Sequence, residues 1–242
     1  ELTSVRLGGR NFYSVEHVRM NNAGKMKVTE VHRCGDLIEK YYRSNSRAFG
    51  IQLGITNSAA AAIFNYGHVE MPVDRNGSCI TPSCVYYPES DNPSYMCGFV
   101  AKHRIESWPK NVIHDFLPLV GVKYSDPVVK HIQESVGFTI VDDGDNNPVI
   151  SVLTHGKEKR LYPEQVSSCI LEHLKELTQS HCRFIFTDVV ISVPVWLSSL
   201  QRQLICDAAV VAGLNPIRVI PDPVAAAYAH NDVLDLEKRD SP

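Results

Sequence analysis

The chain has 242 residues, of which 44% are hydrophobic and 21% are charged, with 14 glycines and 14 prolines. This is an ordinary globular composition, and it excludes collagen, coiled-coil and disordered classes. The formal net charge of −3 gives no reason to expect nucleic acid or an anionic membrane as a partner. No apolar run reaches the roughly eighteen residues of a membrane helix. Seven cysteines without a CxxC pair favour reduced thiols in a reducing compartment, which indicates a cytoplasmic protein.

The first 47 residues are polar and basic, and only the stretch from Val18 shows weak strand alternation. They predict an N-terminal extension with a hairpin or a short helix. The character changes at Ala48, where apolar runs at 49–54 and 59–65 are joined by Ile55-Thr-Asn-Ser58 and a third run follows at 68–73. This pattern predicts a β-meander whose first turn opens at Gly54.

A turn-rich stretch follows, with a helix predicted near 128–136 and a hairpin that turns at 144–147. The last third alternates regularly between helices and strands. The predicted elements are a helix from Pro163, a strand at 188–195, a helix with a Ser198–Gln201 capping box, a strand at 216–220 and a helix opened by Asp222-Pro223. The apolar stripe of the capped helix is assigned to Leu200, Leu204, Ala208 and Val211, with its end at Gly213. Together these elements predict a mixed sheet covered by helices, the α/β class.

The turn after Gly54 is the best candidate for a phosphate site. Gly54 allows close approach of a ligand to the backbone, and Thr56, Asn57 and Ser58 offer amides and side chains in a concave turn. The same residues also suit a simple hairpin turn. Asp222 has two interpretations as well: a general base or ligand of a metal-bound water after a strand, or an ordinary N-cap carboxylate.

Other polar clusters do not make a metal site. Asp142 to Asn147 resembles the start of a calcium loop, but the sixth position lacks glycine and Leu153 stands where a bidentate glutamate is needed. Cys79 and Cys84 lack a second ligand pair at zinc spacing. The sequence therefore predicts no metal bound by the protein alone and no hydrolase triad.

Three long blocks carry a resemblance to a known family. They are FGIQLGITNSAAAAIFNYGHVEMPVDRNGSCITPSCVYY, CGFVAKHRIESWPKNVIHDFLPLVGVKYSDP and DVVISVPVWLSSLQRQLICDAAVVAGLNPIRVIPDPVAAAYAHN. In order and content they resemble the N-terminal ATPase domain of the heat shock protein 70 family, over about residues 49–230. The resemblance implies the actin-like ATPase superfamily fold: a ribonuclease-H-like mixed sheet with flanking helices and a smaller inserted α/β subdomain.

The same resemblance divides the chain into three parts. Residues 1–47 would form the extension, 48–230 the first lobe of the nucleotide-binding domain, and 231–242 an acidic tail. The inserted subdomain would take about residues 86–161. The second phosphate loop, the adenosine-binding lobe and the substrate-binding domain of the family would come after Pro242.

Four positions depart from what the resemblance implies for catalysis. Gln52 replaces the aspartate that holds the waters of magnesium, and an amide binds a hydrated divalent cation poorly. Ile55 replaces a threonine beside the phosphates. Leu117, followed by Pro118, occupies the place of the catalytic lysine, so no cation remains there. Asp222 replaces a glutamate with a shorter carboxylate.

The resemblance also assigns binding and partner roles. Gly54, Thr56, Asn57 and Asp222 would form a weakened site for ATP or ADP with magnesium. Pro194 and Arg202 match positions that relay nucleotide state, and Arg218 matches a position near the surface that engages J-domain co-chaperones. Each also has an ordinary explanation, as a strand-ending proline or a solvated arginine.

Three functions remain open at this point. The first is a divergent chaperone-like protein without efficient ATP hydrolysis that acts through co-chaperones or other subunits. The second is a fragment of an active ATP-dependent folding chaperone. The third is a purely structural subunit of a larger complex. None involves nucleic acid or a membrane.

Overall fold

The computed structural model describes residues 48–63, 69–89, 94–154 and 156–239, with the backbone alone over 231–239, and four short strands in the first 28 residues. These strands form two antiparallel pairs: β1 (Val5–Arg6) with β2 (Phe12–Tyr13), and β3 (Val18–Met20) with β4 (Met26–Val28). The predicted hairpin in the extension therefore corresponds to β3 and β4. The alternative of a helix there falls mostly outside the described residues.

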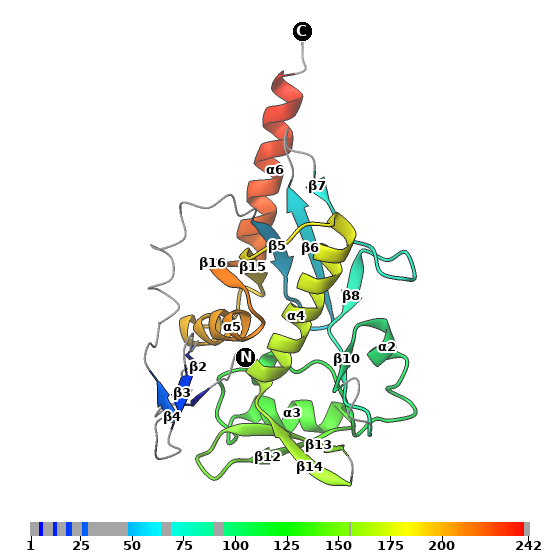
Figure 1. Cartoon of the computed structure of the whole chain (residues 1–242), viewed down its shortest axis with the longest axis vertical. Coiled ribbons are helices and arrows are strands. Elements are labelled where there is room, and N and C mark those ends of the chain that lie inside the picture. Colours follow the sequence, from blue (N-terminus) through cyan, green and yellow to red (C-terminus); the bar gives the residue numbers. More distant parts are fainter. Residues whose placement is uncertain are drawn as a thin grey trace.

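A six-stranded mixed sheet forms the centre of the fold (Figure 1). Its strands are β5 (Phe49–Gln52), β6 (Asn57–Ile63), β7 (Val69–Glu70), β8 (Ile80–Pro82), β15 (Asp188–Val193) and β16 (Asn215–Pro221). The order is β16-β15-β5-β6-β7, with β8 also paired to β6. β15 is parallel to both β5 and β16, whereas β6 is antiparallel to β5, β7 and β8. The predicted meander is confirmed, although β6 begins at Asn57, two residues earlier than expected.

The part of the chain that runs from β8 to the long helix α4 (Pro163–Cys182) forms two smaller three-stranded sheets. The first contains β9 (Val85–Tyr86), β10 (Met96–Cys97) and β11 (Val112–Ile113). The second contains β12 (Thr139–Asp142), β13 (Pro148–Thr154) and β14 (Lys157–Leu161). The helical pieces here are α2 (Phe99–Lys102), the 3-10 turn η2 (Leu117–Leu119) and α3 (Pro127–Ser135). The predicted helix and hairpin of this stretch are confirmed, and β14 adds a third strand.

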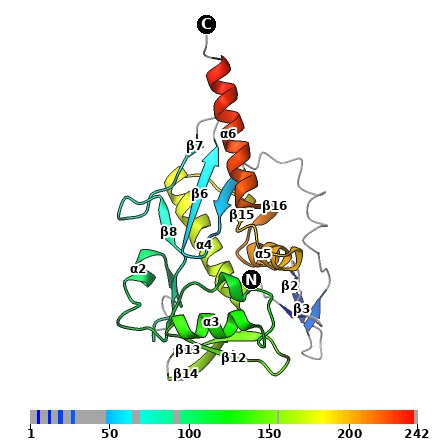
Figure 2. The same cartoon turned by 180° about the vertical axis from the view of Figure 1, so that it is seen from behind.

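Helices cover both faces of the large sheet. α4 lies in front of β6 in Figure 1, whereas Figure 2 brings α6 (Asp222–Arg239) in front of the strands. α4 packs on β6 and on α5 (Ser199–Val211), and α5 packs on β16. Side chains alternate along β5 and the residue after it: Phe49, Ile51 and Leu53 are buried in the core, while Gln52 is exposed. α6 continues past the boundary predicted at 230, so the backbone of 231–239 is helical.

The stripe predicted for α5 is partly wrong. Leu204 and Ala208 are buried, but Leu200 and Val211 are 53% and 41% exposed. The buried residues of the helix are instead Gln201, Leu204, Ile205, Asp207, Ala208 and Ala209. Relative to the predicted stripe, the buried face of the helix is shifted toward Gln201. The Gln201 side-chain amide points inward and donates to the Val120 carbonyl, just after η2, at 2.9 Å. Gly213, at φ 72°, ends the helix as expected.

The capping box of α5 predicts a measurable contribution to stability. The backbone amide of Gln201 donates to Ser198 Oγ at 3.3 Å, and the backbone amide of Ser198 donates to Gln201 Oε1 at 2.8 Å. Ser198→Ala should lower the free energy of unfolding by about 1 kcal/mol, measured by urea denaturation, because the amide loses its acceptor. Ser199→Ala, one residue further on, is the matched control and should leave it nearly unchanged. Equal losses in both variants would contradict the capping role.

Candidate functional site

Three parallel strands end at the same edge of the large sheet. In the register, Gln52 of β5 faces Ser192 of β15, and Ser192 faces Ile220 of β16. The segments that follow these strands therefore lie side by side: Gly54, Pro194 and Asp222. With about 4.8 Å between neighbouring strands, Asp222 lies about 10 Å across the sheet from the β5–β6 turn. Ligands of open α/β sheets bind at such carboxyl edges.

Close packing holds the β5–β6 turn in one shape. A Cβ atom at position 54 would lie 2.2 Å from the Asn57 carbonyl oxygen, so only glycine fits. The Gly54 amide donates to Ser58 Oγ at 3.3 Å, and its carbonyl accepts from Ser83 Oγ at 2.8 Å. Ser58 is thus turned inward and does not offer its hydroxyl to a ligand, contrary to the prediction for this turn. The side chains of Thr56 and Asn57 are exposed.

Asp115 connects the turn to the first small sheet. It lies two residues after the end of β11, with φ at 50°, a left-handed conformation that is uncommon outside glycine. The Thr56 hydroxyl donates to Asp115 Oδ1 over a long 3.5 Å, and Asp115 Oδ2 lies 2.9 Å from His114 Nδ1. Burial, with Asp115 adding to it, raises the pKa of the Cys84 thiol to about 11. This thiol therefore stays protonated at neutral pH and is not a nucleophile.

Asp222 has an unusual environment at the start of α6. Its Oδ1 atom is buried and has no hydrogen-bond partner among the described residues. Buried carboxylate oxygens are normally paired, and an unpaired one calls for an explanation such as a missing ion or ligand. This favours the prediction that Asp222 contacts a ligand over the alternative of a satisfied helix cap.

Besides Asp222, the three other positions that depart from the family's catalytic residues differ in where their side chains lie. Gln52 is exposed at the sheet edge, and Ile55 is half-buried against the core. Leu117 lies in η2 with 1% of its surface exposed, packed inside the main hydrophobic core. The Leu117 side chain therefore does not reach the edge at all. Gln52 and Ile55 belong to the strand and turn of the site, so the structure brings these two to the edge with Gly54, Thr56 and Asn57.

The predicted partner positions lie on neighbouring elements. Pro194 directly follows β15, which ends one residue earlier at Val193, so the strand predicted over 188–195 is shorter. Arg202 is half-buried on α5, and Arg218 is exposed on β16. Only Pro194 lies at the carboxyl edge itself.

Metal binding by protein side chains alone finds no support within residues 48–230 that the structure describes. No group of three or more His, Cys, Asp or Glu side chains converges there. The Asp142 turn satisfies itself, because Asp142 Oδ1 accepts from the amides of Gly144 and Asn146 at 2.9 Å each. Among the described helices, none is long and apolar enough to cross a membrane.

The residues at the carboxyl edge suit a phosphate group better than they suit a magnesium ion. The exposed turn residues Thr56 and Asn57 and the unpartnered oxygen of Asp222 suit a phosphate group with its cation nearby. Gln52 offers an amide where a charged oxygen ligand would be needed, and Leu117 offers no charge. The residues therefore fit the binding of a nucleotide phosphate better than its transfer.

The amino-acid sequence was compared with protein families and with known proteins. The model of the family described as "Hsp70 protein" matches residues 48–239. Heat shock 70 kDa protein 2 of Paracoccidioides lutzii and heat shock 70 kDa protein of Neurospora crassa are each 34% identical over 76% of this chain. Heat shock 70 kDa protein of Ajellomyces capsulatus has the same identity and coverage. The chain spans 27%, 28% and 25% of the length of these three relatives, respectively.

A mixed sheet with helices on both faces and a glycine-opened hairpin at its carboxyl edge defines the actin-like ATPase class. Within that class, the chain belongs to the Hsp70 family, in the region of its nucleotide-binding domain.

Two residues of the site were missed by sequence reasoning. Ser83 and Asp115 both contact the β5–β6 turn, yet they lie 29 and 59 residues from their partners Gly54 and Thr56. No spacing rule links residues so far apart. The DFLPLVG block that begins at Asp115 was the one available signal, and it drew attention to Leu117 instead.

The turn generates a prediction with an internal control. Gly54→Ala should lower the free energy of unfolding by about 1–3 kcal/mol, because the added methyl group overlaps the Asn57 carbonyl. Gly50→Ala, in the same hairpin, places its methyl group 3.8 Å from the Ala61 carbonyl and should be tolerated. Urea denaturation of both variants measures the difference, and an equally stable Gly54→Ala variant would show that the turn is not closely packed.

Proposed function

We propose that this chain is a divergent, cytoplasmic member of the Hsp70 family that does not hydrolyse ATP efficiently and acts through protein–protein interactions. The observation that carries the proposal is Leu117. The resemblance puts the family's catalytic lysine at this position, and here the side chain is 1% exposed inside the core. No other residue of the sequence is assigned to replace that charge.

Gln52 and Ile55 support the same conclusion. Each removes a group that the resemblance places beside the phosphates or the magnesium waters. Loss of a single electrostatic donor typically costs about 3–4 kcal/mol of transition-state stabilisation. Such losses do not simply add, but together they favour binding without turnover.

Residual nucleotide binding is part of the proposal. Gly54, Thr56 and Asn57 would contact the phosphates of ATP or ADP, and Asp222 would face the accompanying magnesium with its waters. The unpartnered Asp222 oxygen supports this assignment. A nucleotide held without hydrolysis would act as a structural ligand, stabilising the lobe in proportion to its occupancy.

An exposed apolar surface supports the proposed interaction with proteins. Val195 and Trp196 follow Pro194, and Leu200 lies on the first turn of α5; they are 63%, 47% and 53% exposed. Neighbouring exposed apolar side chains mark interaction sites more often than ordinary surface. Pro194 and Arg202 lie beside them in the sequence. We propose that this surface binds co-chaperones or other subunits, with Arg218 contributing from β16.

A second candidate function is a fragment of an active, ATP-dependent chaperone. The coverage of the relatives favours it, since the chain spans about a quarter of their length, 27% in the first case. A second lobe in the natural polypeptide would supply the rest of a nucleotide site. A purely structural subunit, the third possibility, has no specific observation in its favour.

The two candidates predict different phosphate release. The natural polypeptide that carries these residues, incubated with ATP and magnesium, should release phosphate at least about a hundredfold more slowly than a fungal Hsp70 assayed alongside. Turnover at the rate of that relative would overturn the proposal and support the active chaperone.

Thermal unfolding with nucleotide tests the binding part separately. Gln52→Asp restores a carboxylate at an exposed position and should increase the stabilisation by Mg-ATP, because a charged oxygen binds the hydrated cation better. A ligand at a hundred times its dissociation constant stabilises by about 2.7 kcal/mol. If ATP and ADP at millimolar concentration shift neither the wild type nor Gln52→Asp, the proposed nucleotide site is wrong.

A further inference from the structure

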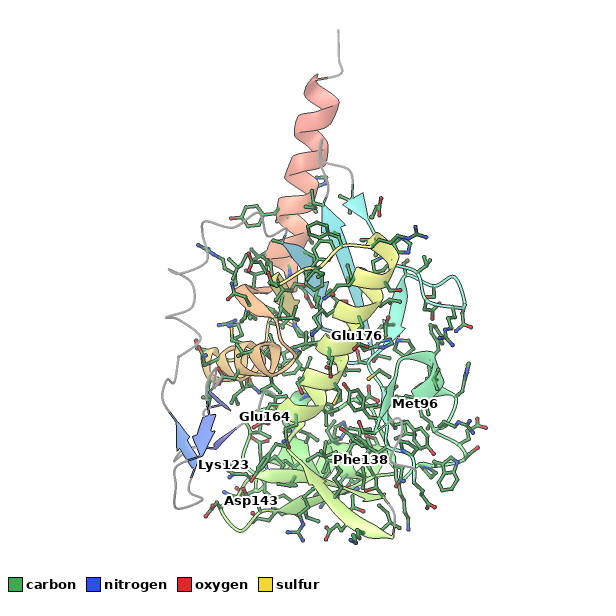
Figure 3. The ribbon with its side chains drawn as sticks, viewed as in Figure 1. Met96, Lys123, Phe138, Asp143, Glu164 and Glu176 are labelled. Carbon is green, nitrogen blue, oxygen red and sulfur yellow. The ribbon has the colours of Figure 1, made fainter. Side chains whose placement is uncertain are left out.

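A pocket lies away from the carboxyl edge, between α4, the β10–α2 segment and the loop that leads into β8. Its volume is about 740 Å³, within the range of about 300–1,000 Å³ that is typical of ligand pockets. Figure 3 labels Met96 and Glu176 on its two sides, from β10 and α4. None of its lining residues belongs to the β5–β6 turn or to α6. The pocket is therefore distinct from the proposed nucleotide site.

The charged groups in this pocket are mainly acidic. Asp74, Glu172 and Glu176 line it, and Arg75 is the one lysine or arginine among the described residues that line it. His173 adds no positive charge at neutral pH, because burial lowers the pKa of its ring although Asp74 opposes the shift. These three carboxylates, two from α4 and one from the loop before β8, give the pocket a negative potential that favours a cation.

The three carboxylates differ in their existing partners. Asp74 accepts from the amides of Asn76 and Ser78 at 2.8 and 2.9 Å, which fixes its loop. Glu172 accepts from the Tyr95 hydroxyl. Glu176 lies one helical turn beyond Glu172 on the same face of α4 and has no hydrogen bond or ion pair among the described residues. It is the carboxylate available to a ligand.

The remaining wall is aromatic and apolar. Tyr95 and Phe99 line the pocket together with Met96, Val100 and Leu177, and Val100 is 53% exposed. Aromatic side chains beside carboxylates suit a planar guanidinium, which stacks on aromatic rings and donates in the plane to carboxylate oxygens. An ammonium group lacks that planar geometry, and an anion would be repelled.

We propose that this pocket binds an arginine side chain from an extended segment of a partner protein. The guanidinium donates to Glu176 and approaches Glu172, while the apolar residues next to the arginine contact Phe99, Val100 and Leu177. The occupant follows from charge complementarity and from the size of the pocket, which holds more than one side chain. This site does not depend on nucleotide binding, so it can succeed or fail independently of the function proposed above.

The test uses a fluorescein-labelled ten-residue peptide with a central arginine flanked by leucine, glycine and serine. Fluorescence anisotropy should show saturable binding to the 242-residue chain. Binding should weaken about tenfold with Glu176→Gln, because the charge-assisted hydrogen bond is lost. Arg75→Ala should strengthen it, because that substitution removes the one like charge. Glu134→Gln, an exposed glutamate on α3 outside the pocket, is the matched control and should bind as the wild type does.

Peptides with glutamine or glutamate in place of the arginine define the outcomes that overturn the proposal. Equal binding of the glutamine peptide would show an apolar site without charge recognition. Tighter binding of the glutamate peptide would show that the pocket prefers a negative charge to a positive one. Unchanged affinity in Glu176→Gln would exclude the pocket. Self-association of the chain that disappears in Glu176→Gln would identify a second copy as the occupant. Because Glu176 is exposed, the variant should fold, which circular dichroism checks.

Discussion

The parallel register of β5, β15 and β16 is the constraint on which the site depends. The Leu53 amide donates to the Ser192 carbonyl at 2.9 Å, which extends the pairing of β5 and β15 up to the residue before Gly54. A slip of one residue would turn Phe49, Ile51 and Leu53 out of the core and move the turn along the edge. The apolar alternation that stabilises the sheet therefore also sets where a phosphate could be held.

Regular elements were predictable because their signals are local. The alternation of β5, the spacing of Val166, Ile170 and Leu174 in α4, and the capping box of α5 all follow from residues within a turn or two of one another. The orientation of α5 was not predictable in the same way. It depends on the bond between Gln201 and Val120, which lie 81 residues apart, and a polar residue on the buried face contradicts a simple apolar stripe.

The candidate site was predictable in outline and not in detail. Gly54, Thr56 and Asn57 were found because a glycine-opened turn has a recognisable composition. The unpartnered oxygen of Asp222 and the inward rotation of Ser58 depend on neighbours distant in the sequence, such as Ser83. The proposed arginine pocket had no sequence signal, since its walls come from three separate segments that meet only in the folded chain.

The burial of Leu117 limits which side chains position 117 can accept. A lysine placed there would have to give up its hydration inside a packed core, at a cost of several kcal/mol, or leave a cavity by swinging outward. Either outcome would remove a large part of the roughly 5–15 kcal/mol by which domains are usually stable. A Leu117→Lys substitution alone would therefore be destabilising, and the packing around η2 would have to change before a lysine could be accommodated there.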